Sequence, residues 1–393
     1  MRAFQYYMKT EVVFGAGAEA QTASLVRKHG GSRVLVVYGG GSAVRSGLLD
    51  RICTRLADLG IPYDTFGGVQ PNPRLAHARR GVEQAIAMEA DFLLAVGGGS
   101  VIDTAKAIAH GAANPEVDIW DFWLKKAAVE KTLPVGVVLT IPAAGSETSD
   151  SAVLTDEETC SKRGLSTDYN RPAFAVLDPK LPATLPRYQV ACGAADMMAH
   201  ILERYFSHTP DVLLTDRLCE ALLKTVLDAA PLAVADDTHY TAHADLMWAG
   251  MLAHNNLCGT GRVQDWASHQ MGHELSARYN CAHGASLAIM MPAWMEYVYQ
   301  QDVARFARFA VNVMGCEMDF ADPQRTAKAG IARFRAFLAS LGLPTSLKEV
   351  GGSAEDIPAI VDHRRPKPNA FPFGNFMKIG PEEMAAIYHL SDR

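Results

Sequence analysis

The sequence lacks the cysteine pattern of a disulfide-stabilised or zinc-ribbon protein. Its seven cysteines stand singly and never form a C-x-x-C pair; they lie at positions 53, 160, 192, 219, 258, 281 and 316. An odd number of isolated cysteines gives no disulfide framework and indicates reduced thiols in a reducing compartment. The first residues, MRAFQYYMKTEVVFGAG, also lack the charged and then apolar regions of a signal peptide. We therefore expect a cytoplasmic protein.

Long apolar runs and an excess of positive charge are absent too. No apolar run reaches the roughly 18 residues that a membrane-spanning helix needs. Acidic residues outnumber basic ones by 43 to 37, which gives a net charge of −6 without any basic stripe. This charge argues against binding to nucleic acid or to an anionic membrane. With 393 residues, 49% of them hydrophobic, the chain has a soluble globular profile and enough length for two domains.

Apolar runs alternate with helical patterns in the first half of the chain only. Strand-like runs occur at 33–38, 91–96, 134–142 and 174–179, with amphipathic stretches at 45–59 and 73–90 between them. Such runs, separated by helices, indicate a parallel sheet that is covered on both faces. After a proline-rich boundary at 178–186, helical periodicity marks segments 187–205, 211–230, 240–258, 263–278, 299–314 and 324–341.

These patterns predict an α/β fold followed by an all-α region. We assign residues 1–182 to a Rossmann-like nucleotide-binding domain with a parallel sheet, and residues 183–393 to an all-helical domain. The proline-rich stretch 365–374 is expected to form a surface loop.

Two predicted strands end in the same glycine-rich turn, and a predicted helix follows each. The turns are Gly39-Gly40-Gly41-Ser42 and Gly97-Gly98-Gly99-Ser100. Glycines let the backbone approach a phosphate closely, and the N–H groups of a helix N-terminus hold the anion. The second turn is the better pyrophosphate candidate because Ser100 can cap the long helix that follows. The same helix carries Asp103, which we also predict to bind the cofactor. Neither turn is G-x-G-x-x-G, and either alone would be an ordinary tight turn. Two of them at the carboxyl ends of parallel strands indicate a nucleotide.

A third turn, 140–149, also follows a predicted strand. Its hydroxyl groups, notably those of Thr140 and Ser146, are candidates for contacts with a ribose or a nicotinamide. On composition alone, a surface loop rich in small residues explains this turn equally well.

A carboxylate and several imidazoles form two tight groups in the second half. Asp196 and His200 lie one helical turn apart, and His269-x3-His273-x9-His283 follows. A buried carboxylate is costly unless it is partnered, and metal coordination is one way to offset that cost. We predict that Asp196, His200, His269 and His283 bind one divalent metal ion, because imidazole and carboxylate suit Fe, Zn or Ni. His273 then points into the same cavity, where it relays a proton or fixes the substrate.

The alternative is a set of histidines with no metal. Asp196 and His200 would then form an i,i+4 helix pair worth a few tenths of a kcal/mol. The later histidines would line a wet helix face and a turn. The apolar neighbours of Asp196, which are Ala194, Ala195, Met197 and Met198, argue against a solvated pair.

Several longer motifs carry a family resemblance. They are GGGSVIDTAKAIA at 97–109, FAVLDP at 174–179, GAADMMAH at 193–200, QDWASHQMGHELSA at 264–277 and AHGASLAIMMP at 282–292. With these motifs the chain resembles, from end to end, the iron-containing (group III) alcohol dehydrogenases, and within them the branch of butanol dehydrogenases and NADPH-dependent aldehyde reductases. The resemblance implies a nucleotide domain, a helical domain, a metal in the cleft between them and a homodimer. The family's ligand pattern matches Asp196, His200, His269 and His283, and its additional active-site histidine matches His273.

The resemblance also informs the choice of cofactor. NAD-preferring relatives carry an Asp just after the first strand, where this chain has Gly39. Loss of that carboxylate removes a repulsion of the 2′-phosphate, and Ser42 can donate a hydrogen bond to it. Lys162 matches a lysine that relatives in the branch place near the same phosphate. We predict NADP(H), with NAD(H) as the alternative. Ala282 replaces a proline that many relatives have before the last ligand.

Together, the residues and the resemblance predict a reversible dehydrogenase for small aldehydes and primary alcohols. A divalent metal, Fe²⁺ with Zn²⁺ or Ni²⁺ as alternatives, would polarise the carbonyl, and the nicotinamide would supply hydride. Trp266, Phe371 and Phe373 are candidates for the substrate pocket. Two other functions stay open at this point. One is a metallohydrolase, which would leave the glycine turns without a role, and the other is a non-redox relative resembling dehydroquinate synthase.

Overall fold

The computed structural model describes residues 1–143, 145–159, 161–365 and 370–392, and within them the chain forms two compact units. The sheet unit contains Tyr7–Leu185 and Asp237–Asn255. The helical unit contains Met1–Tyr6, Pro186–Asp236 and Asn256–Arg393. The main division falls near the predicted boundary at residue 182, but two short segments belong to the unit formed by the other half of the chain.

The sheet unit is built on a six-stranded sheet with the order β1-β8-β5-β4-β2-β3. Every neighbouring pair is parallel. The strands are β1 (Glu11–Phe14), β2 (Val34–Gly39), β3 (Tyr63–Val69), β4 (Phe92–Gly97), β5 (Val135–Leu139) and β8 (Phe174–Leu177). The parallel sheet predicted from the apolar runs is therefore confirmed. The edge strands β1 and β3 were not predicted, because their residues are largely exposed or half-buried and do not form apolar runs.

The strand order reverses between β2 and β4. The chain runs from β2 to β3 on one side and then crosses to β4 on the other side of β2. In open α/β sheets of this kind, ligands bind outside the carboxyl ends of the strands at the point of reversal. Both glycine-rich turns lie there, since one follows β2 and the other follows β4.

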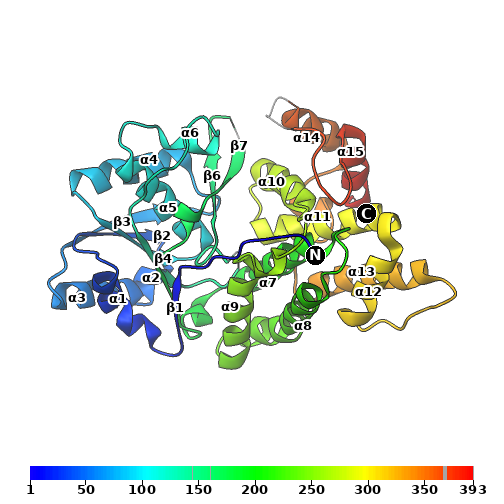
Figure 1. The fold of residues 1–393 in the computed structure, drawn as a ribbon, viewed down its shortest axis with the longest axis horizontal. Coiled ribbons are helices and arrows are strands. Elements are labelled where there is room, and N and C mark those ends of the chain that lie inside the picture. The colour runs from blue at the N-terminus through cyan, green and yellow to red at the C-terminus, as the bar shows by residue number, and fades with distance from the viewer. Residues whose placement is uncertain (144, 160, 366–369, 393) are drawn as a thin grey trace. The chain divides into compact units, whose positions relative to one another are not determined.

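Helices cover both faces of this sheet (Figure 1). On one face, α1 (Thr22–Lys28) and α3 (Leu48–Asp58) pack their apolar side chains against Val34 and Val36. On the other face, α4 (Leu75–Ala87) and α5 (Gly99–Ala113) pack against Leu35 and Val37. Burial on both faces is the reason why β2, β4, β5 and β8 are apolar throughout rather than alternating.

The helix α9 (Tyr240–His254) also belongs to the sheet unit, although it lies in the helical half of the sequence. Its Met247 and Met251 are fully buried in the core that α5 forms with the sheet. The remaining elements of the unit are α2 (Ser42–Arg45), α6 (Ile119–Trp123) and an antiparallel hairpin of β6 (Ser151–Asp156) and β7 (Ser161–Ser166).

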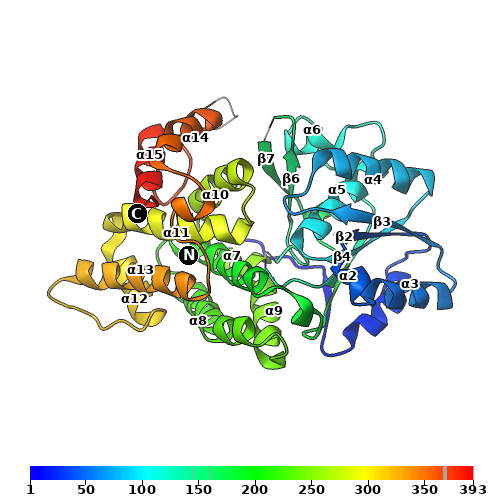
Figure 2. The same ribbon diagram turned by 180° about the vertical axis from the view of Figure 1, so that it is seen from behind.

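Helices make up the other unit, which Figure 2 shows from behind. They are α7 (Arg187–Tyr205), α8 (Leu213–Ala235), α10 (Ala267–Tyr279), α11 (His283–Val298), α12 (Val303–Asn312), α13 (Pro323–Ser340), α14 (Ile357–Arg364) and α15 (Pro381–Leu390). The prediction of a helix at 187–205 is confirmed to the residue. The helix α11 was missed because nearly all of its side chains are buried, so its sequence has no polar face and no amphipathic period.

Short 3₁₀ segments complete the described chain, at Ala18–Gln21, Asp168–Asn170, Leu181–Thr184, Leu257–Gly259, Tyr299–Asp302, Lys348–Val350 and Ala354–Asp356. Residues 366–369 of the predicted surface loop 365–374 lie outside the described residues, as does Cys160. In the parts of the chain that the structure describes, no helix has both the length and the apolar character that crossing a membrane requires.

Candidate functional site

Helices of the helical unit bring the predicted metal ligands together. Helix α7 carries Asp196 and His200, α10 carries His269 in its first turn, and α11 begins with His283. One ligand atom from each of Asp196, His200 and His269 lies within 4.8 Å of the others, and all three residues are buried. We refer to Asp196, His200, His269 and His283 as the candidate metal centre, in short the metal centre.

Asp196 Oδ1 is the common neighbour of the three imidazoles. It lies 3.5 Å from His200 Nδ1, 3.8 Å from His269 Nε2 and 3.8 Å from His283 Nε2. These separations are longer than good hydrogen bonds. Among the described residues, Asp196 Oδ1 and both ring nitrogens of His269 have no hydrogen-bond partner. Buried polar atoms without partners call for an explanation, and one carboxylate with three imidazoles fits a first-row divalent cation.

A close helix contact places His283 at this centre. A Cβ atom on Gly284, the next residue, would lie only 2.0 Å from the carbonyl oxygen of Cys192 on α7. Glycine therefore lets the first turn of α11 approach the backbone of α7. Because of this approach, the His283 imidazole at the start of α11 comes within 3.8 Å of the Asp196 carboxylate in the middle of α7.

The indole of Trp266 forms a wall of the metal centre. Its ring centroid lies 5.1 Å from that of His269 and 5.9 Å from that of His200. The Arg204 guanidinium stacks on the indole, 4.5 Å from the ring centroid. Trp266 precedes α10 with φ = 88°, a left-handed conformation that is strained for a bulky side chain and that is often found at functional sites.

The other two candidates for the substrate pocket, Phe371 and Phe373, contact a different set of residues from Trp266. Phe371 and Phe373 face one another at a centroid distance of 5.8 Å. The Arg364 guanidinium lies over both rings, 5.7 and 4.2 Å from their centroids.

His273 lies beside the centre rather than in it. Its ring centroid is 6.4 Å from that of His269 and 5.2 Å from that of His283, and the residue is half-buried.

The carboxylate of Glu203 also contacts the centre, and the sequence analysis did not single it out. Glu203 Oε1 accepts a hydrogen bond from the backbone N–H of His269 at 2.9 Å and lies 3.5 Å from His269 Nδ1. Burial lowers the pKa of His269, but Glu203 and Asp196 raise it, to about 9. The available signal was a charged residue three positions after His200 in an otherwise apolar stretch of α7.

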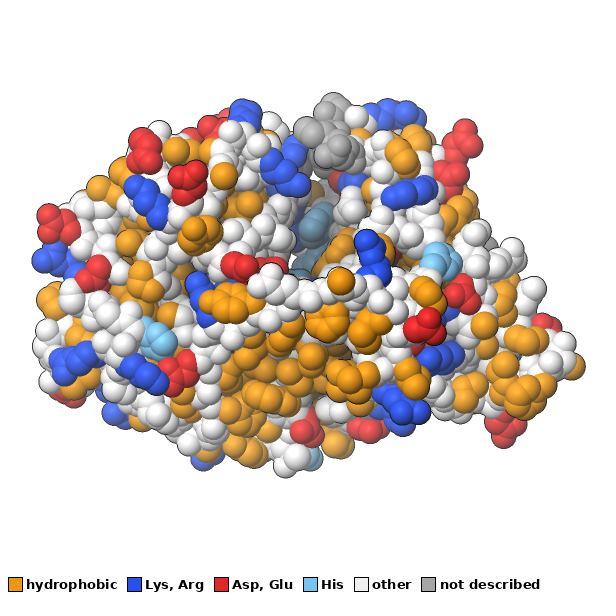
Figure 3. Space-filling model, viewed as in Figure 1, with side chains coloured by type: hydrophobic (Ala, Val, Ile, Leu, Met, Phe, Trp, Pro, Cys, Tyr) orange, Lys and Arg blue, Asp and Glu red, His pale blue; other side chains and the backbone are white. Residues whose placement is uncertain are grey.

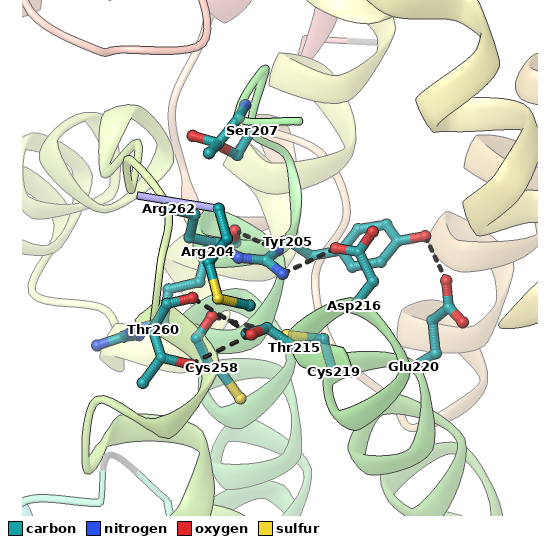
Figure 4. Close-up of polar contacts among 12 residues, drawn as sticks. Arg204, Tyr205, Ser207, Thr215, Asp216, Cys219, Glu220, Cys258, Thr260 and Arg262 are labelled. Carbon is teal, nitrogen blue, oxygen red and sulfur yellow. Dashed lines mark hydrogen bonds and ion pairs between the residues drawn. The ribbon is translucent and has the colours of Figure 1, made fainter. Parts of the chain in front are cut away.

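A network of arginines and carboxylates fixes the end of α7 that follows His200 (Figure 4). Arg204 donates to the carbonyl oxygen of His200 at 2.7 Å, and Arg262 donates to the carbonyl oxygen of Arg204 at 3.0 Å. Arg262 is itself held by Asp216 on α8, at 2.8 Å. The two contacts of Arg262 are long-range in sequence, so no local pattern predicted them.

In the sheet unit, the two glycine turns have different requirements for glycine. Gly41 has φ = 122°, which L side chains rarely adopt. Gly97 and Gly98 have no such angle, but Cβ atoms there would lie 2.5 Å from Val101 Cγ2 and 2.9 Å from Ile141 Cβ. Gly39 and Gly40 meet no close contact, and Ser42 begins α2.

The prediction that Ser100 caps α5 is wrong. The helix begins one residue earlier, at Gly99, and its N-cap is Gly98, which has no side chain to donate or accept. Ser100 therefore lies within the first turn, where its carbonyl oxygen accepts a hydrogen bond from Thr104.

Lys106 joins the turn after β5 to α5. Its Nζ donates to Ser146 O at 2.8 Å, Ser146 Oγ at 2.9 Å and Ser151 O at 2.8 Å. Ser146 Oγ in turn donates to Asp103 Oδ1 at 2.6 Å. Burial lowers the pKa of Lys106 to about 8 and raises that of Asp103. Asp103 and Ser146, both predicted to bind cofactor, thus have internal partners that shape the turn, and their cofactor contacts stay predictions.

The remaining cofactor candidates in the sheet unit are Thr140, in the turn after β5, and Lys162, on β7. The Thr140 N–H donates to the carbonyl oxygen of Gly97 at 3.0 Å, which ties the turn after β5 to the glycine turn after β4. Lys162 lies on β7, and its Nζ donates to Asn72 Oδ1 at 3.0 Å. Asn72, in the loop after β3, was not predicted; its φ of 57° is a left-handed conformation.

Comparisons with known proteins agree with this architecture. Residues 9–179 match the family model "Iron-containing alcohol dehydrogenase", and residues 190–391 match "Fe-containing alcohol dehydrogenase family, C-terminal". A probable NADH-dependent butanol dehydrogenase 2 of Bacillus subtilis is 38% identical over 391 residues, which is 100% of both chains. The NADPH-dependent aldehyde reductase YqhD of Escherichia coli is 36% identical over 92% of both chains.

A solved structure gives the same result. The crystal structure of NADH-dependent butanol dehydrogenase A from Thermotoga maritima superposes with a TM-score of 0.96 at 37% identity, covering 100% of this chain and 99% of that one. None of these comparisons supports the metallohydrolase or the dehydroquinate-synthase-like alternative. The resemblance seen in the motifs is confirmed: the chain belongs to the iron-containing alcohol dehydrogenase family and is an oxidoreductase of the alcohol dehydrogenase type.

Proposed function

We propose that the protein interconverts small aldehydes and primary alcohols with NADP(H) at a divalent metal ion held by Asp196, His200, His269 and His283. The observation that carries this proposal is the environment of Asp196 Oδ1, a buried oxygen with no hydrogen-bond donor and with three imidazole nitrogens 3.5 to 3.8 Å away. When bound, a metal ion supplies Lewis-acid polarisation of a carbonyl oxygen and a nicotinamide supplies hydride. Fe²⁺ is proposed, with Zn²⁺ and Ni²⁺ as alternatives for the same donor set.

The protein's own residues have distinct tasks in this scheme. The four ligands would hold the ion that polarises the reacting oxygen, and the indole of Trp266 excludes water from the His200 and His269 side of the centre. His273 is proposed to move the proton to or from that oxygen, because it lies one helical turn from His269 and is half-buried rather than enclosed.

The direct test replaces a ligand and follows NADPH absorbance with butanal. His269→Ala and His283→Ala should lose both bound metal and turnover, whereas His208→Ala should lose neither. His208 is a suitable control because it lies in the same unit but bonds to Phe376 O. Reconstitution of the stripped protein with Fe²⁺, Zn²⁺ or Ni²⁺ identifies the active ion. Full turnover by metal-free protein would contradict the proposal.

The choice of NADP(H) rests on the turn after β2. The relatives named above differ, since two are called NADH-dependent and one NADPH-dependent. In this chain Gly39 provides no carboxylate to repel a 2′-phosphate, and Ser42 provides a hydroxyl. Arg45 adds a cation, because its Nη1 lies 3.1 Å from the point where a Cβ on Gly41 would stand. Lys162 is the second cation proposed for this phosphate.

Gly39→Asp is a sharp test of this choice. A Cβ on Gly39 would meet Val101 Cγ2 and Val69 O at 3.5 Å, an ordinary contact, so the variant should fold. We expect kcat/KM for NADPH to fall at least tenfold and that for NADH to hold or rise, because the new carboxylate repels the phosphate and bonds the ribose. Gly164→Asp on β7, where a Cβ meets nothing within 4 Å, is the control. Unchanged cofactor preference in Gly39→Asp would contradict the choice.

We further propose that residues 1–182 and 183–393 act as nucleotide and metal domains, and that the protein forms a homodimer in the cytoplasm. Figure 3 shows exposed hydrophobic side chains over α9, where Trp248 is 45% exposed and stacks edge-on against Phe14 of the edge strand β1. Exposed apolar patches of this kind often mark subunit contacts. Light scattering of Phe14→Ser/Trp248→Ser should report a smaller particle than the unmodified protein.

A further inference from the structure

The ring of His269 lies between two buried carboxylates. On one side, His269 Nε2 faces Asp196 Oδ1 at 3.8 Å. On the other, His269 Nδ1 faces Glu203 Oε1 at 3.5 Å, and the same oxygen accepts the backbone N–H of His269 at 2.9 Å. The two nitrogens therefore have different neighbours, and only the Nε2 side belongs to the metal centre.

Glu203 is buried on α7 at a position from which it can hold the His269 side chain and the start of α10. It lies on α7, one helical turn after His200, and is 2% exposed. Its backbone carbonyl oxygen accepts the N–H of Asp265 at 2.8 Å, which brings the chain into position just before α10. The Glu203 side chain therefore holds the backbone at the start of α10 and faces the ring of its first histidine.

The Glu203 carboxylate faces His269 and has no other basic side chain paired with it among the described residues. No lysine or arginine forms an ion pair with Glu203 in the described chain, and Glu203 Oε2 has no hydrogen-bond partner there. Its neighbour Arg204 is directed elsewhere, to the carbonyl oxygen of His200 and to the indole of Trp266. Glu203 and Asp196 together bring two negative charges to His269, and a divalent cation balances them.

We propose that Glu203 is a positioning residue that holds His269 with its Nδ1–H towards the Glu203 carboxylate and its Nε2 lone pair towards the metal. This inference rests on the proposed metal centre and extends it. An imidazole ligand commonly donates its second N–H to a carboxylate, which fixes the tautomer and the ring orientation and makes the ligating nitrogen more basic. Loss of such a partner typically costs about 10- to 100-fold in metal affinity.

The test measures Zn²⁺ affinity of the metal-stripped protein by competition with a chromogenic chelator. We expect Glu203→Ala to bind Zn²⁺ about 10- to 100-fold more weakly than the unmodified protein, and Glu203→Gln to be intermediate, because an amide oxygen still accepts the N–H bonds without the charge. Glu220→Gln is the matched control. Glu220 is a buried carboxylate of α8 that accepts from Tyr205 Oη at 2.9 Å, away from His269 (Figure 4), so its replacement should leave Zn²⁺ affinity unchanged.

A second readout separates positioning from a merely structural role. The shift in Tm that saturating Zn²⁺ produces should shrink in Glu203→Gln and stay unchanged in Glu220→Gln, whatever happens to the Tm of the metal-free forms. NADPH binding, a property of the sheet unit, should survive in all variants and shows that they are folded. If Glu203→Ala fails to fold, the Zn²⁺ affinity and the Zn²⁺-dependent Tm shift of Glu203→Gln test the proposal.

Two results would overturn the inference in distinguishable ways. If both Glu203 variants bind Zn²⁺ as tightly as the unmodified protein while His269→Ala does not, the metal centre stands and Glu203 has no part in it. If His269→Ala also binds Zn²⁺ normally, the proposed centre itself is wrong and the inference falls with it.

Discussion

Asp103 and Asp196 are both carboxylates on helices, one in each unit. Asp103 is half-buried and Asp196 is buried, and their hydrogen-bond partners differ. Each oxygen of Asp103 has a donor, Ser146 Oγ at 2.6 Å and the Val153 N–H at 2.9 Å. Asp196 Oδ1 has none in the described chain and instead faces three imidazole nitrogens. A carboxylate whose oxygens the protein satisfies shapes a turn, whereas a buried one left without donors is suited to bind a cation.

The largest expected effect is that of Asp196→Asn, which we compare with the same substitution at Asp103 in a separate variant. Asp196→Asn should lose the metal and about 10³-fold in kcat/KM, since a metal contributes several kcal/mol to transition-state stabilisation. Asp103→Asn should keep the metal and lose about 1–3 kcal/mol of stability, because one donor loses a charged acceptor. Elemental analysis, butanal reduction and urea unfolding measure these outcomes. Metal loss in Asp103→Asn, or full metal in Asp196→Asn, would break the distinction.

A buried histidine whose polar atoms the protein satisfies, His110, should reveal its burial through the pH dependence of stability. His110 is buried with both ring nitrogens bonded to neutral partners, Thr132 Oγ1 at 2.9 Å and Asn170 Oδ1 at 2.8 Å. Burial lowers the pKa of His110 from 6.5 to about 4. Between these values the unfolded chain binds a proton that the folded chain does not, so the free energy of unfolding should fall as pH falls, by about 3 kcal/mol in all.

Urea unfolding of metal-free protein from pH 7 to pH 4 measures this dependence. His110→Gln should show a flatter profile over that range than the unmodified protein, because the amide does not titrate. Equal slopes in the two proteins would mean that His110 is not the group responsible.

A methyl group at Gly284 should have the next largest effect. The added Cβ would lie 2.0 Å from the carbonyl oxygen of Cys192, and backbone cannot rotate away as a flexible side chain can. We expect Gly284→Ala to lose about 2 kcal/mol of stability and to bind metal less tightly, since His283 is the adjacent residue. Gly164→Ala, with nothing within 4 Å of its Cβ, should be neutral in both measurements. An unaltered metal content in a destabilised Gly284→Ala would separate packing from ligation.

The smallest expected effect concerns Lys106 and the cofactor. Lys106→Met removes the bonds that hold Ser146 and Ser151, so the turn after β5 should be less ordered. We expect the Kd for NADPH, measured by quenching of protein fluorescence, to rise about tenfold, equivalent to roughly 1.4 kcal/mol. Metal content should not change. The reverse pattern, with weaker metal binding and normal NADPH binding, would contradict the assignment of Lys106 to the nucleotide side.

The sequence predicted what depends on residue type and short spacing. The apolar runs of the central strands, the helix 187–205 and the gathering of Asp196, His200 and His269 all follow from local patterns. Edge strands such as β3 were missed because exposed strands have no apolar run, and α11 because a helix buried on all sides has no amphipathic period.

Contacts between distant parts of the chain could not be predicted from the sequence. Glu203 and Lys106 bond to residues 66 and 40 positions away, and the local sequence does not identify those partners. The capping role given to Ser100 failed for a smaller reason: the helix begins at Gly99, two residues earlier than a cap at Ser100 would require. Helix ends are the least certain part of any pattern-based assignment.

The membership of α9 in the sheet unit has a consequence for biosynthesis. A ribosome must translate residue 255 before the core that includes Met247 and Met251 is complete, although the last strand of the sheet ends at Leu177. By then α7 and α8 have already emerged, whereas α10 and α11 have not. The nascent sheet unit must therefore wait, with an apolar surface exposed, while part of the helical unit is made. Neither unit is a contiguous piece of the gene, so no single cut in the coding sequence yields either one intact.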